Sequence, residues 1–433
     1  MTDLPLLSDL NAMGESLPGA GLGWLADLRR HGLDRYEGLG LPTTKVEEWK
    51  YTNLRPLAAA GFSIARAPSG TMSKDVPDLG LADGALRVVL VNGHVDDGLS
   101  ELTDLPDGLA LLPFERAVAQ CPEIVERHLG KVARLDRKAL VALNTAHLDG
   151  GLVLHVAAGT RIERPVHLAF VGQAGSEHLA WQPRLLIVAE NDSALTVVET
   201  HSGDGAYFSN GVSEAVVGEG AALRHYKIQD EDRRAFHIAA IEASVAARGL
   251  YESFILSTGG ALSRNQLGVL FAGEDATCRL NGAYLMRGSQ HADTTSVIDH
   301  AVPHCTSTEV YKGVLDDKAR AVFQAKTIVR KDAQKTDARQ LNKTLLLSNR
   351  AEIDAKPELE IYADDVLCSH GATAGEIDEN ALFYLRSRGI DAEDARAMLI
   401  DAFVDEALLE ISEENLRDVF RATVARWRQG SGA

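Results

Sequence analysis

The stretch "RLLIVAENDSALTVVETHS" (184–202) decides the fold class. Two runs rich in Val, Leu and Ile are separated by an Asn-Asp-Ser sequence, which is typical of a turn. Similar short apolar runs follow one another from Gly151, divided by Gly, Asn, Asp or charged residues. No long helical pattern interrupts them before Cys368, which argues against a doubly wound α/β fold, since that fold needs helices between its strands. The chain is therefore predicted to be mainly β.

A faint recurrence runs through these strands. A turn-like residue followed by alanine or glycine opens several of them, as at Ala194, Ala222, Gly249 and Ala276. These positions are 28, 27 and 27 residues apart. A period in this range indicates a solenoid, in which each coil stacks on the one before it. The later repeats are less regular, so a large β-sandwich is the alternative.

Helical patterns flank the strand region on both sides. The predicted division is a mixed, mainly helical N-terminal region at 1–150, a β core at 151–375 and a C-terminal helical domain at 376–433. In the last of these, Asp378, Asp391 and Ser412 are placed to cap three helices.

The C-terminal helical domain also carries two apolar stripes. They consist of Leu399, Ile400, Phe403 and Val404, followed by Leu416, Val419, Phe420 and Val424. The simpler interpretation is that the stripes are packed in a core. The other is that one stripe binds a partner, because a small helical appendage has little else to bury against.

Charge and cysteine content exclude several classes of protein. The chain has 44 Lys and Arg against 62 Asp and Glu, a formal net charge of −18. This surface repels phosphates and anionic lipids, so neither nucleic acid nor a membrane is expected as a partner. The start lacks the pattern of a signal peptide, and no run approaches the roughly 20 apolar residues of a membrane helix. With four cysteines and no CxxC pair, a cytoplasmic location is expected.

Common catalytic motifs are absent from the sequence. It contains no P-loop, GxSxG or HExxH pattern. The segment "HADTTSVIDHAVPHC" (291–305) gathers three histidines, but Pro303 lies between His300 and His304, and the β-branched neighbours favour a strand. Separate histidines, either solvated or hydrogen-bonded, are the expectation there, rather than a helical metal site.

The segment "DDVLCSHGATAG" (364–375) places a cysteine one residue away from a histidine. Residues two apart in a strand face the same side, so Cys368 and His370 would point together. Thiolate and imidazole are ligands for iron, zinc or copper(I), but two ligands do not complete a tetrahedral site. The pattern predicts a half-site that is open to a partner or a transient cargo. A small buried cysteine beside a surface histidine is the simpler alternative.

A longer segment, "KPELEIYADDVLCSHGATAGEIDENALFYLRSRGI" (356–390), resembles the C-terminal signature of the SufB/SufD family of iron–sulfur cluster assembly proteins. Other segments resemble the same family in the same order: 40–54, 280–307 and 332–354. The B-type signature of the family resembles C-x-H-E-A-T-T. Here Gly371 follows His370, as in D-type chains.

The resemblance implies a right-handed parallel β-helix with helical regions at both ends, and a non-catalytic scaffold. It implies a complex with a SufB-like paralogue and a SufC-like ABC ATPase, and the absent P-loop agrees with ATP hydrolysis by that partner. It places Cys368 and His370 at the interface with the SufB-like subunit, as metal ligands for iron or a transient iron–sulfur cluster. No permanently bound cofactor is expected. Reduced flavin and iron supply are associated with the complex, but no residue is assigned to either.

The resemblance also places ATPase docking in the C-terminal helical domain. The predicted contacts are Leu382, Phe383, Leu399 and Phe403. Two other functions stay open. One is a homodimeric metal carrier, in which two Cys368/His370 half-sites meet across a two-fold axis. The other is a β-helix enzyme acting on carbohydrate, although no aromatic-lined acidic cleft is evident in a chain with 6% aromatic residues.

Overall fold

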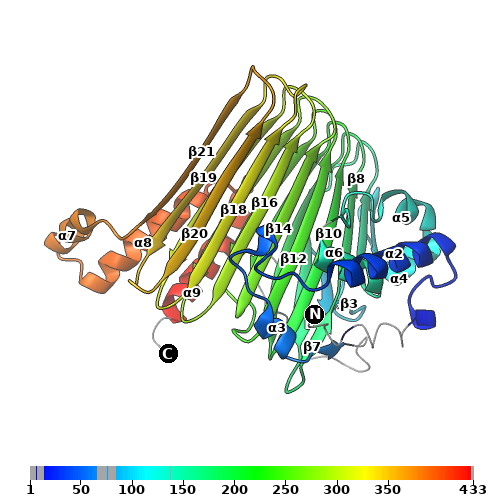
Figure 1. Ribbon diagram of the computed structural model, residues 1–433, viewed down its shortest axis with the longest axis horizontal. Coiled ribbons are helices and arrows are strands. Elements are labelled where there is room, and N and C mark those ends of the chain that lie inside the picture. Colours follow the sequence, from blue (N-terminus) through cyan, green and yellow to red (C-terminus); the bar gives the residue numbers. More distant parts are fainter. Residues whose placement is uncertain (1–5, 7–13, 66–75, 77–83, 137, 431–433) are drawn as a thin grey trace.

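A parallel β-solenoid forms the middle of the molecule, with helices at both ends of the chain (Figure 1). The computed structural model describes residues 6, 14–65, 76, 84–136 and 138–430. The coils contribute strands to two sheets, here called sheet A and sheet B. The prediction of a mainly β solenoid is confirmed, and the β-sandwich alternative is wrong, because strands pair in parallel with those one coil away.

Sheet A has the strand order β20-β18-β16-β14-β12-β10-β8-β5-β4, with β1 and β7 attached beside β10. Its strands are β1 Ser63–Ile64, β4 Leu109–Pro113, β5 Gly151–Val156, β7 Leu179–Trp181, β8 Arg184–Ala189, β10 Tyr207–Val217, β12 Phe236–Val245, β14 Leu262–Phe271, β16 His291–His300, β18 Arg320–Val329 and β20 Glu352–Ile361.

Sheet B has the order β21-β19-β17-β15-β13-β11-β9-β6-β2-β3. Its strands are β2 Leu86–Val91, β3 His94–Val95, β6 Val166–Gln173, β9 Ala194–Asp204, β11 Ala222–Gln229, β13 Leu250–Ser257, β15 Thr277–Met286, β17 Thr306–Leu315, β19 Asp337–Leu346 and β21 Leu367–Gly375. Strands β20 and β21 are thus the last strands at the C-terminal end of the two sheets.

The recurrence in the sequence corresponds to one coil. In sheet B the register runs through Ala194, Ala222, Leu250, Thr277 and Thr306, with separations of 28, 28, 27 and 29 residues. The next two coils take 31 and 30 residues. This lengthening explains why the later repeats look irregular in the sequence.

A left-handed residue at the corners explains the turn signal. Asp192, Arg248 and Asp275 have φ values of 57°, 57° and 59°. Glycine takes this conformation without steric cost, as Gly220 does, and aspartate tolerates it better than most residues. Ala276, which follows Asp275, is fully buried, so the small side chain at this position reflects the tight interior of the corner.

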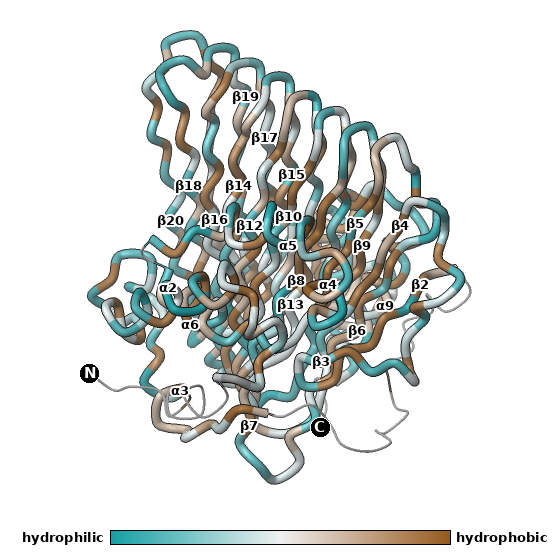
Figure 2. The backbone as a smooth tube through the Cα atoms, turned by 90° about the vertical axis from the view of Figure 1, so that its right-hand side faces the viewer, coloured by the Kyte–Doolittle hydropathy of each residue, from teal (hydrophilic) through white to brown (hydrophobic). Residues whose placement is uncertain are grey.

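Alternate side chains along each strand point into the space between the sheets. Strand β8 contributes Leu185, Ile187 and Ala189 to the largest buried cluster, and β9 contributes Leu195 and Val197. The alternation of brown and teal along the solenoid strands in Figure 2 agrees with this period of two residues. Burial of one face of each strand therefore holds the two sheets together.

The N-terminal region packs against the outer face of sheet A. Its helices are η1 Gly14–Ser16, α2 Gly23–Leu39, η2 Glu47–Trp49, α3 Arg55–Ala59, α4 Phe114–Gln120, α5 Pro122–His128 and α6 Ala139–His147. Phe62 and Leu143 share a buried cluster with Phe208 and Ile238 of the sheet. None of the described helices, here or at the C-terminus, has the length and apolar character needed to cross a membrane.

A buried ion pair connects this region to the solenoid. The guanidinium of Arg184 and the carboxylate of Glu214 are both fully buried, with Nη2 and Oε1 2.7 Å apart. Glu214 also accepts hydrogen bonds from the backbone N–H of Gly130 at 2.8 Å and of Ala133 at 2.9 Å. Arg184 donates a further bond to Asn144 at 2.9 Å. Buried charges are tolerated in a folded protein when they are paired and hydrogen-bonded, as these two are.

Three helices follow the solenoid: α7 Glu379–Ser387, α8 Ala392–Leu408 and α9 Glu414–Gln429. Asp378 and Asp391 accept hydrogen bonds from backbone N–H groups of the first turns of α7 and α8, so both predicted caps are confirmed. The predicted cap at Ser412 is wrong. Its hydroxyl donates to Glu252 of β13, and α9 begins after Glu413 without a side-chain cap.

The two apolar stripes pack against the outer face of sheet B. Ile400 and Val404 of α8 are buried in one cluster with Phe420 of α9 and Phe254 of β13. The rings of Phe254 and Phe420 meet edge to face, with their centroids 5.4 Å apart. Core packing is therefore confirmed as the main use of these stripes. Helices α8 and α9 cover the outer face of sheet B, and this packing surface was not predicted from the sequence.

Candidate functional site

Cys368 and His370 lie on β21, the last strand of sheet B (Figure 1). Strand β21 pairs with β19 alone, with Cys368 opposite Ala338 and His370 opposite Gln340. The expectation that both residues lie on one strand is confirmed. That strand begins only at Leu367, because a turn separates it from β20.

Both side chains lie on the face of sheet B that lines the solenoid interior. Cys368 continues a column of residues that runs through Ala338, Ser307 and Cys278, and Cys278 belongs to the largest buried cluster. Cys368 is half-buried, whereas His370 is exposed. The inward face of the last coil is thus open to the outside, and the two donors lie at this opening.

Burial raises the pKa of the Cys368 thiol above its ordinary value, and the nearby Asp337 carboxylate adds to this. The thiol therefore keeps its proton at neutral pH, and metal binding must displace it. Within the described residues, the one group of three His, Cys, Asp or Glu side chains close enough to hold an ion lies elsewhere, in the solenoid interior. Within that part of the chain, Cys368 and His370 offer two donors and no third.

The outer edge of β21 carries free backbone groups. The N–H of Leu367 donates to the carbonyl of Thr336 at 2.8 Å, so odd-numbered residues of β21 hydrogen-bond to β19. The N–H and C=O groups of Cys368, His370 and Ala372 consequently point away from the sheet. They form a continuous row that a further strand could pair with.

The edge of β20 differs from that of β21. The N–H of Glu352 donates to the carbonyl of Ala319 at 3.0 Å, so the odd-numbered residues of β20 face outward. Pro357 stands among them and has no N–H to donate. The free edge of sheet A is therefore interrupted, and the unbroken edge is that of sheet B.

The four residues predicted for ATPase docking divide into two pairs. Helix α7 projects from the end of the solenoid and has no buried residue (Figure 1); on it, Leu382 is half-buried and Phe383 is 75% exposed. On α8, Leu399 and Phe403 are partly buried against the cluster on sheet B. The ring of Phe403 also lies 4.3 Å from Nζ of Lys312. The first pair is free for a partner, and the second is partly used in packing.

The histidines of the segment 291–305 are kept apart by the structure. Nε2 of His291 lies 2.9 Å from the hydroxyl of Thr52, and Nε2 of His300 lies 2.9 Å from the hydroxyl of Ser307. The third, His304, is in a turn with a φ of 61°. The expectation of separate, hydrogen-bonded histidines is confirmed for His291 and His300.

The N-terminal segment 40–54 is held on sheet A by buried polar contacts. The carboxylate of Asp293 accepts a hydrogen bond from Thr52 and pairs with Arg264. The guanidinium of Arg264 also stacks 3.9 Å above the ring of Trp49 and donates to the carbonyl of Glu48 at 2.7 Å. The role of this segment in the described structure is to anchor the N-terminal region.

Sequence reasoning missed a group of buried titratable side chains between the sheets. His201 lies near the end of β9, Glu231 follows β11, and His237 is near the start of β12. One nitrogen or oxygen atom of each lies within 4.8 Å of those of the other two, and all three residues are buried. The signal was available: Glu199 and His201 occupy the inward positions of a strand whose earlier inward residues are apolar.

Burial also sets the protonation of this group. It lowers the pKa of His201 to about 4 and lowers that of His237 as well, so both imidazoles are neutral at pH 7. For Glu231, burial opposes ionisation, but contacts with the two histidines and Gln229 outweigh it and lower the pKa to about 2. The group therefore contains two neutral imidazoles and one carboxylate.

A buried carboxyl group lies in the same inward column as His370. Glu309 of β17 is opposite Gln340, which is opposite His370. The carboxyl accepts a hydrogen bond from Ser296 at 2.6 Å, and burial raises its pKa to about 8. At neutral pH it is thus protonated in the folded chain and ionised in the unfolded chain.

The variant Glu309→Gln is expected to lose part of the pH dependence of stability. Between pH 4.5 and pH 8 the folded chain holds a proton that the unfolded chain has released, so wild-type stability falls as pH rises. From pH 6 to pH 8 this amounts to about 2 kcal/mol, and the amide avoids it. Urea unfolding at the two pH values measures the difference. Glu274→Gln, in an exposed turn, should keep the wild-type slope, and equal slopes for wild type and Glu309→Gln would contradict the argument.

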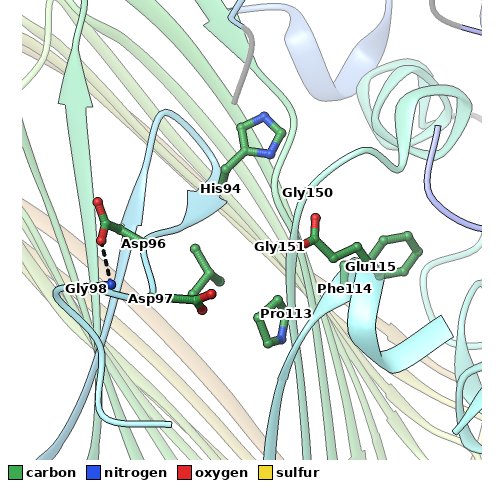
Figure 3. Close-up of a pocket in the computed structure, with 10 residues that line it drawn as sticks. His94, Asp96, Asp97, Gly98, Pro113, Phe114, Glu115, Gly150 and Gly151 are labelled. Atoms are coloured by element: carbon green, nitrogen blue, oxygen red, sulfur yellow. Dashed lines mark hydrogen bonds between the residues drawn. The ribbon is translucent and has the colours of Figure 1, made fainter. Parts of the chain in front are cut away.

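A surface cavity of about 350 Å³ lies at the β3 end of sheet B, away from β21 (Figure 3). Its lining includes His94, Asp96, Asp97, Glu115 and Gly151. Asp96 accepts a hydrogen bond from the N–H of Gly98 at 2.9 Å, and Asp97 pairs with Arg116. Both carboxylates therefore already have partners, and none of the predicted site residues lines this cavity.

Known proteins with similar sequences cover nearly the whole chain. The family model described as "SUF system FeS cluster assembly, SufBD core domain" matches residues 170–403, and "SufBD protein N-terminal region" matches 20–168. An iron–sulfur cluster assembly SufBD family protein of Synechocystis is 34% identical, over 93% of this chain and 90% of its own. The iron–sulfur cluster assembly protein SufD of Escherichia coli is 33% identical over 89% of each chain, and that of Bacillus subtilis is 27% identical over 93% and 94%.

Proposed function

Because this chain belongs to the SufBD family of SUF-system iron–sulfur cluster assembly proteins, we propose that it is a scaffold subunit whose assembly site is completed by a second subunit. That subunit is a SufB-like paralogue. Cys368 and His370 are the metal donors that this chain contributes to the site between the two subunits. Iron or a nascent cluster passes through as cargo, not as a resident cofactor. The location that fits this role is the cytoplasm.

The observation that carries the proposal is the presence of a free edge and two metal donors on one strand. A partner strand added to β21 would extend sheet B and place its own inward side chains next to Cys368 and His370. Leu367 and Tyr362 at the same end are 69% and 64% exposed. Solenoids need their end coils covered, by polar caps or by a partner, and a partner would bury these apolar side chains.

Helix α7 supplies a surface for the ATPase. Phe383 and Tyr384 are 75% and 56% exposed on a helix without buried residues. Exposed aromatic side chains on a projecting helix suit recognition in an apolar groove. We assign this surface to a SufC-like ABC ATPase, with Leu382 and Phe383 of α7 as the main contacts and the half-buried Leu399 and Phe403 of α8 as further contacts. The partner would supply ATP hydrolysis, since this sequence has no P-loop.

The variant Ala372→Pro is expected to weaken pairing with the paralogue by about tenfold, equivalent to one lost hydrogen bond. The N–H of Ala372 points away from β19, so proline removes a donor from the free edge only. Thr373→Pro is the contrasting variant, because it removes a bond to β19 and should lower the melting temperature of the isolated chain. Native mass spectrometry of the tagged chain, co-expressed with the SufB-like and SufC-like proteins of its host, measures the complex.

Each outcome of this experiment bears on the proposal. A wild-type complex of all three proteins, weakened in Ala372→Pro, supports it. A complex that is equally stable in that variant would contradict the use of β21 as the pairing edge. A chain that stays alone would overturn the shared site, and a chain that pairs only with a second copy would favour the homodimeric metal carrier.

A further inference from the structure

The interior group His201, Glu231 and His237 has the composition of a metal site. Two imidazoles and one carboxylate are ligands for Fe²⁺ and Zn²⁺ in proteins, whereas Mg²⁺ and Ca²⁺ prefer oxygen. The three residues come from consecutive parts of two coils, at the corner where the chain passes from sheet B to sheet A. Their potential ligand atoms all lie within 4.8 Å of one another. Metal–nitrogen bonds are about 2.0–2.1 Å, so an ion would draw the side chains together.

A buried polar atom beside the group has no partner among the described residues. Nδ1 of His237, which is 1% exposed, and Oε2 of Glu231 lie 2.8 Å apart, so these two side chains already face each other. The side-chain nitrogen of Gln229 donates to Glu231, whereas its side-chain oxygen makes no hydrogen bond to any residue that the structure describes. Buried polar atoms in proteins are nearly always satisfied, and a water bound to an ion at this group would supply a donor to that oxygen.

A second shell of contacts orients the three side chains. Nε2 of His201 lies 2.8 Å from Oε2 of Glu199, which leaves Nδ1 as the nitrogen available to an ion. Nε2 of His237 accepts a hydrogen bond from Nζ of Lys227 at 2.8 Å, so the ring proton is on Nδ1, toward Glu231, and an ion bound at Nδ1 would displace that proton. The contact of His201 with the Glu199 carboxylate is the kind that usually holds the second nitrogen of a metal-bound histidine.

We infer that His201, Glu231 and His237 form a binding site for one divalent first-row transition-metal ion inside the solenoid. The chemistry fits Fe²⁺ and Zn²⁺ alike. The site is separate from Cys368 and His370 and contains no sulfur. It therefore does not depend on a partner subunit or on the proposed scaffold function.

Metal titration of the full-length, chelator-treated chain tests this inference. Zn²⁺, Co²⁺ and, without oxygen, Fe²⁺ are each expected to bind at about one equivalent per chain in the high-affinity phase. X-ray absorption of the zinc-loaded wild type should show only nitrogen and oxygen ligands. Competition between Fe²⁺ and Zn²⁺ then shows which ion the site prefers. Because these readouts use the wild type, they do not depend on whether a variant folds.

Variants locate the bound ion. Glu231→Gln and His201→Gln are expected to weaken binding by about tenfold or more. His300→Gln, which changes a buried histidine outside the group, and the double variant Cys368→Ser/His370→Ala should bind as the wild type does. The inference is overturned if the wild type binds no stoichiometric metal, if sulfur appears among the ligands, or if the Cys368/His370 variant is the one that loses the ion.

Discussion

The variant Glu214→Ala is expected to unfold with a free energy about 3–5 kcal/mol below that of the wild type. Removing the carboxylate leaves the fully buried guanidinium of Arg184 without its charged partner. It also leaves the backbone N–H groups of Gly130, Val132 and Ala133 without their acceptor. These losses fall where the N-terminal region meets the solenoid. Urea unfolding followed by circular dichroism measures the change.

The exposed ion pair between Glu219 and Arg248 gives a matched control. Its side chains are 49% and 60% exposed, and pairs of this kind contribute about 0–1 kcal/mol. Glu219→Ala is therefore expected to change stability little. If it costs as much as Glu214→Ala, burial is not what makes the Arg184 pair important.

The variants Cys368→Ala and His370→Ala are expected to lower cluster formation by the reconstituted three-protein complex by roughly tenfold or more, an effect typical of altered metal sites. Each removes one of the two donors that this chain presents at the end of sheet B. Iron and acid-labile sulfide bound to the complex, together with its visible absorption, measure cluster formation. Because the strand is exposed, neither variant should change the melting temperature of the isolated chain by much.

Ser369→Ala is the control on the same strand. Ser369 lies between the two donors but faces the other side of the sheet, so cluster formation should be unchanged. Native mass spectrometry of each variant complex separates loss of donors from loss of assembly. If both donor variants form clusters at the wild-type rate in an intact complex, the assignment of the site to Cys368 and His370 is wrong.

The solenoid was predictable because residues typical of its corners recur in the sequence at intervals of about one coil. Several corners combine a residue in the left-handed conformation with a small buried residue directly after it, as at Asp275 and Ala276. The caps at Asp378 and Asp391 were predictable for a similar reason, since a capping side chain acts within one turn of its own helix. The failure at Ser412 arose because a distant acceptor, Glu252, takes the hydroxyl.

The two candidate sites also differ in how well the sequence alone could predict them. The spacing of Cys368 and His370 is local, so one strand was enough to predict that they point together. The interior group was missed because Glu231 meets His201 and His237 only when two coils are stacked and a corner is turned. Which edge of the solenoid is continuous was not readable either. It follows from the hydrogen-bond register, which places the backbone of Pro357 on the free side of β20.

The return of α8 and α9 along sheet B changes how the molecule can come apart. A solenoid whose coils touch only their neighbours can unravel from one end, a coil at a time. Here the chain's last helices bury Tyr226, Phe254 and Leu285, on strands β11, β13 and β15. The middle coils and the C-terminus are thereby tied into one cooperative unit. The open end that presents Cys368 can then fray or rearrange on meeting a partner, while the coils behind it are held as a block.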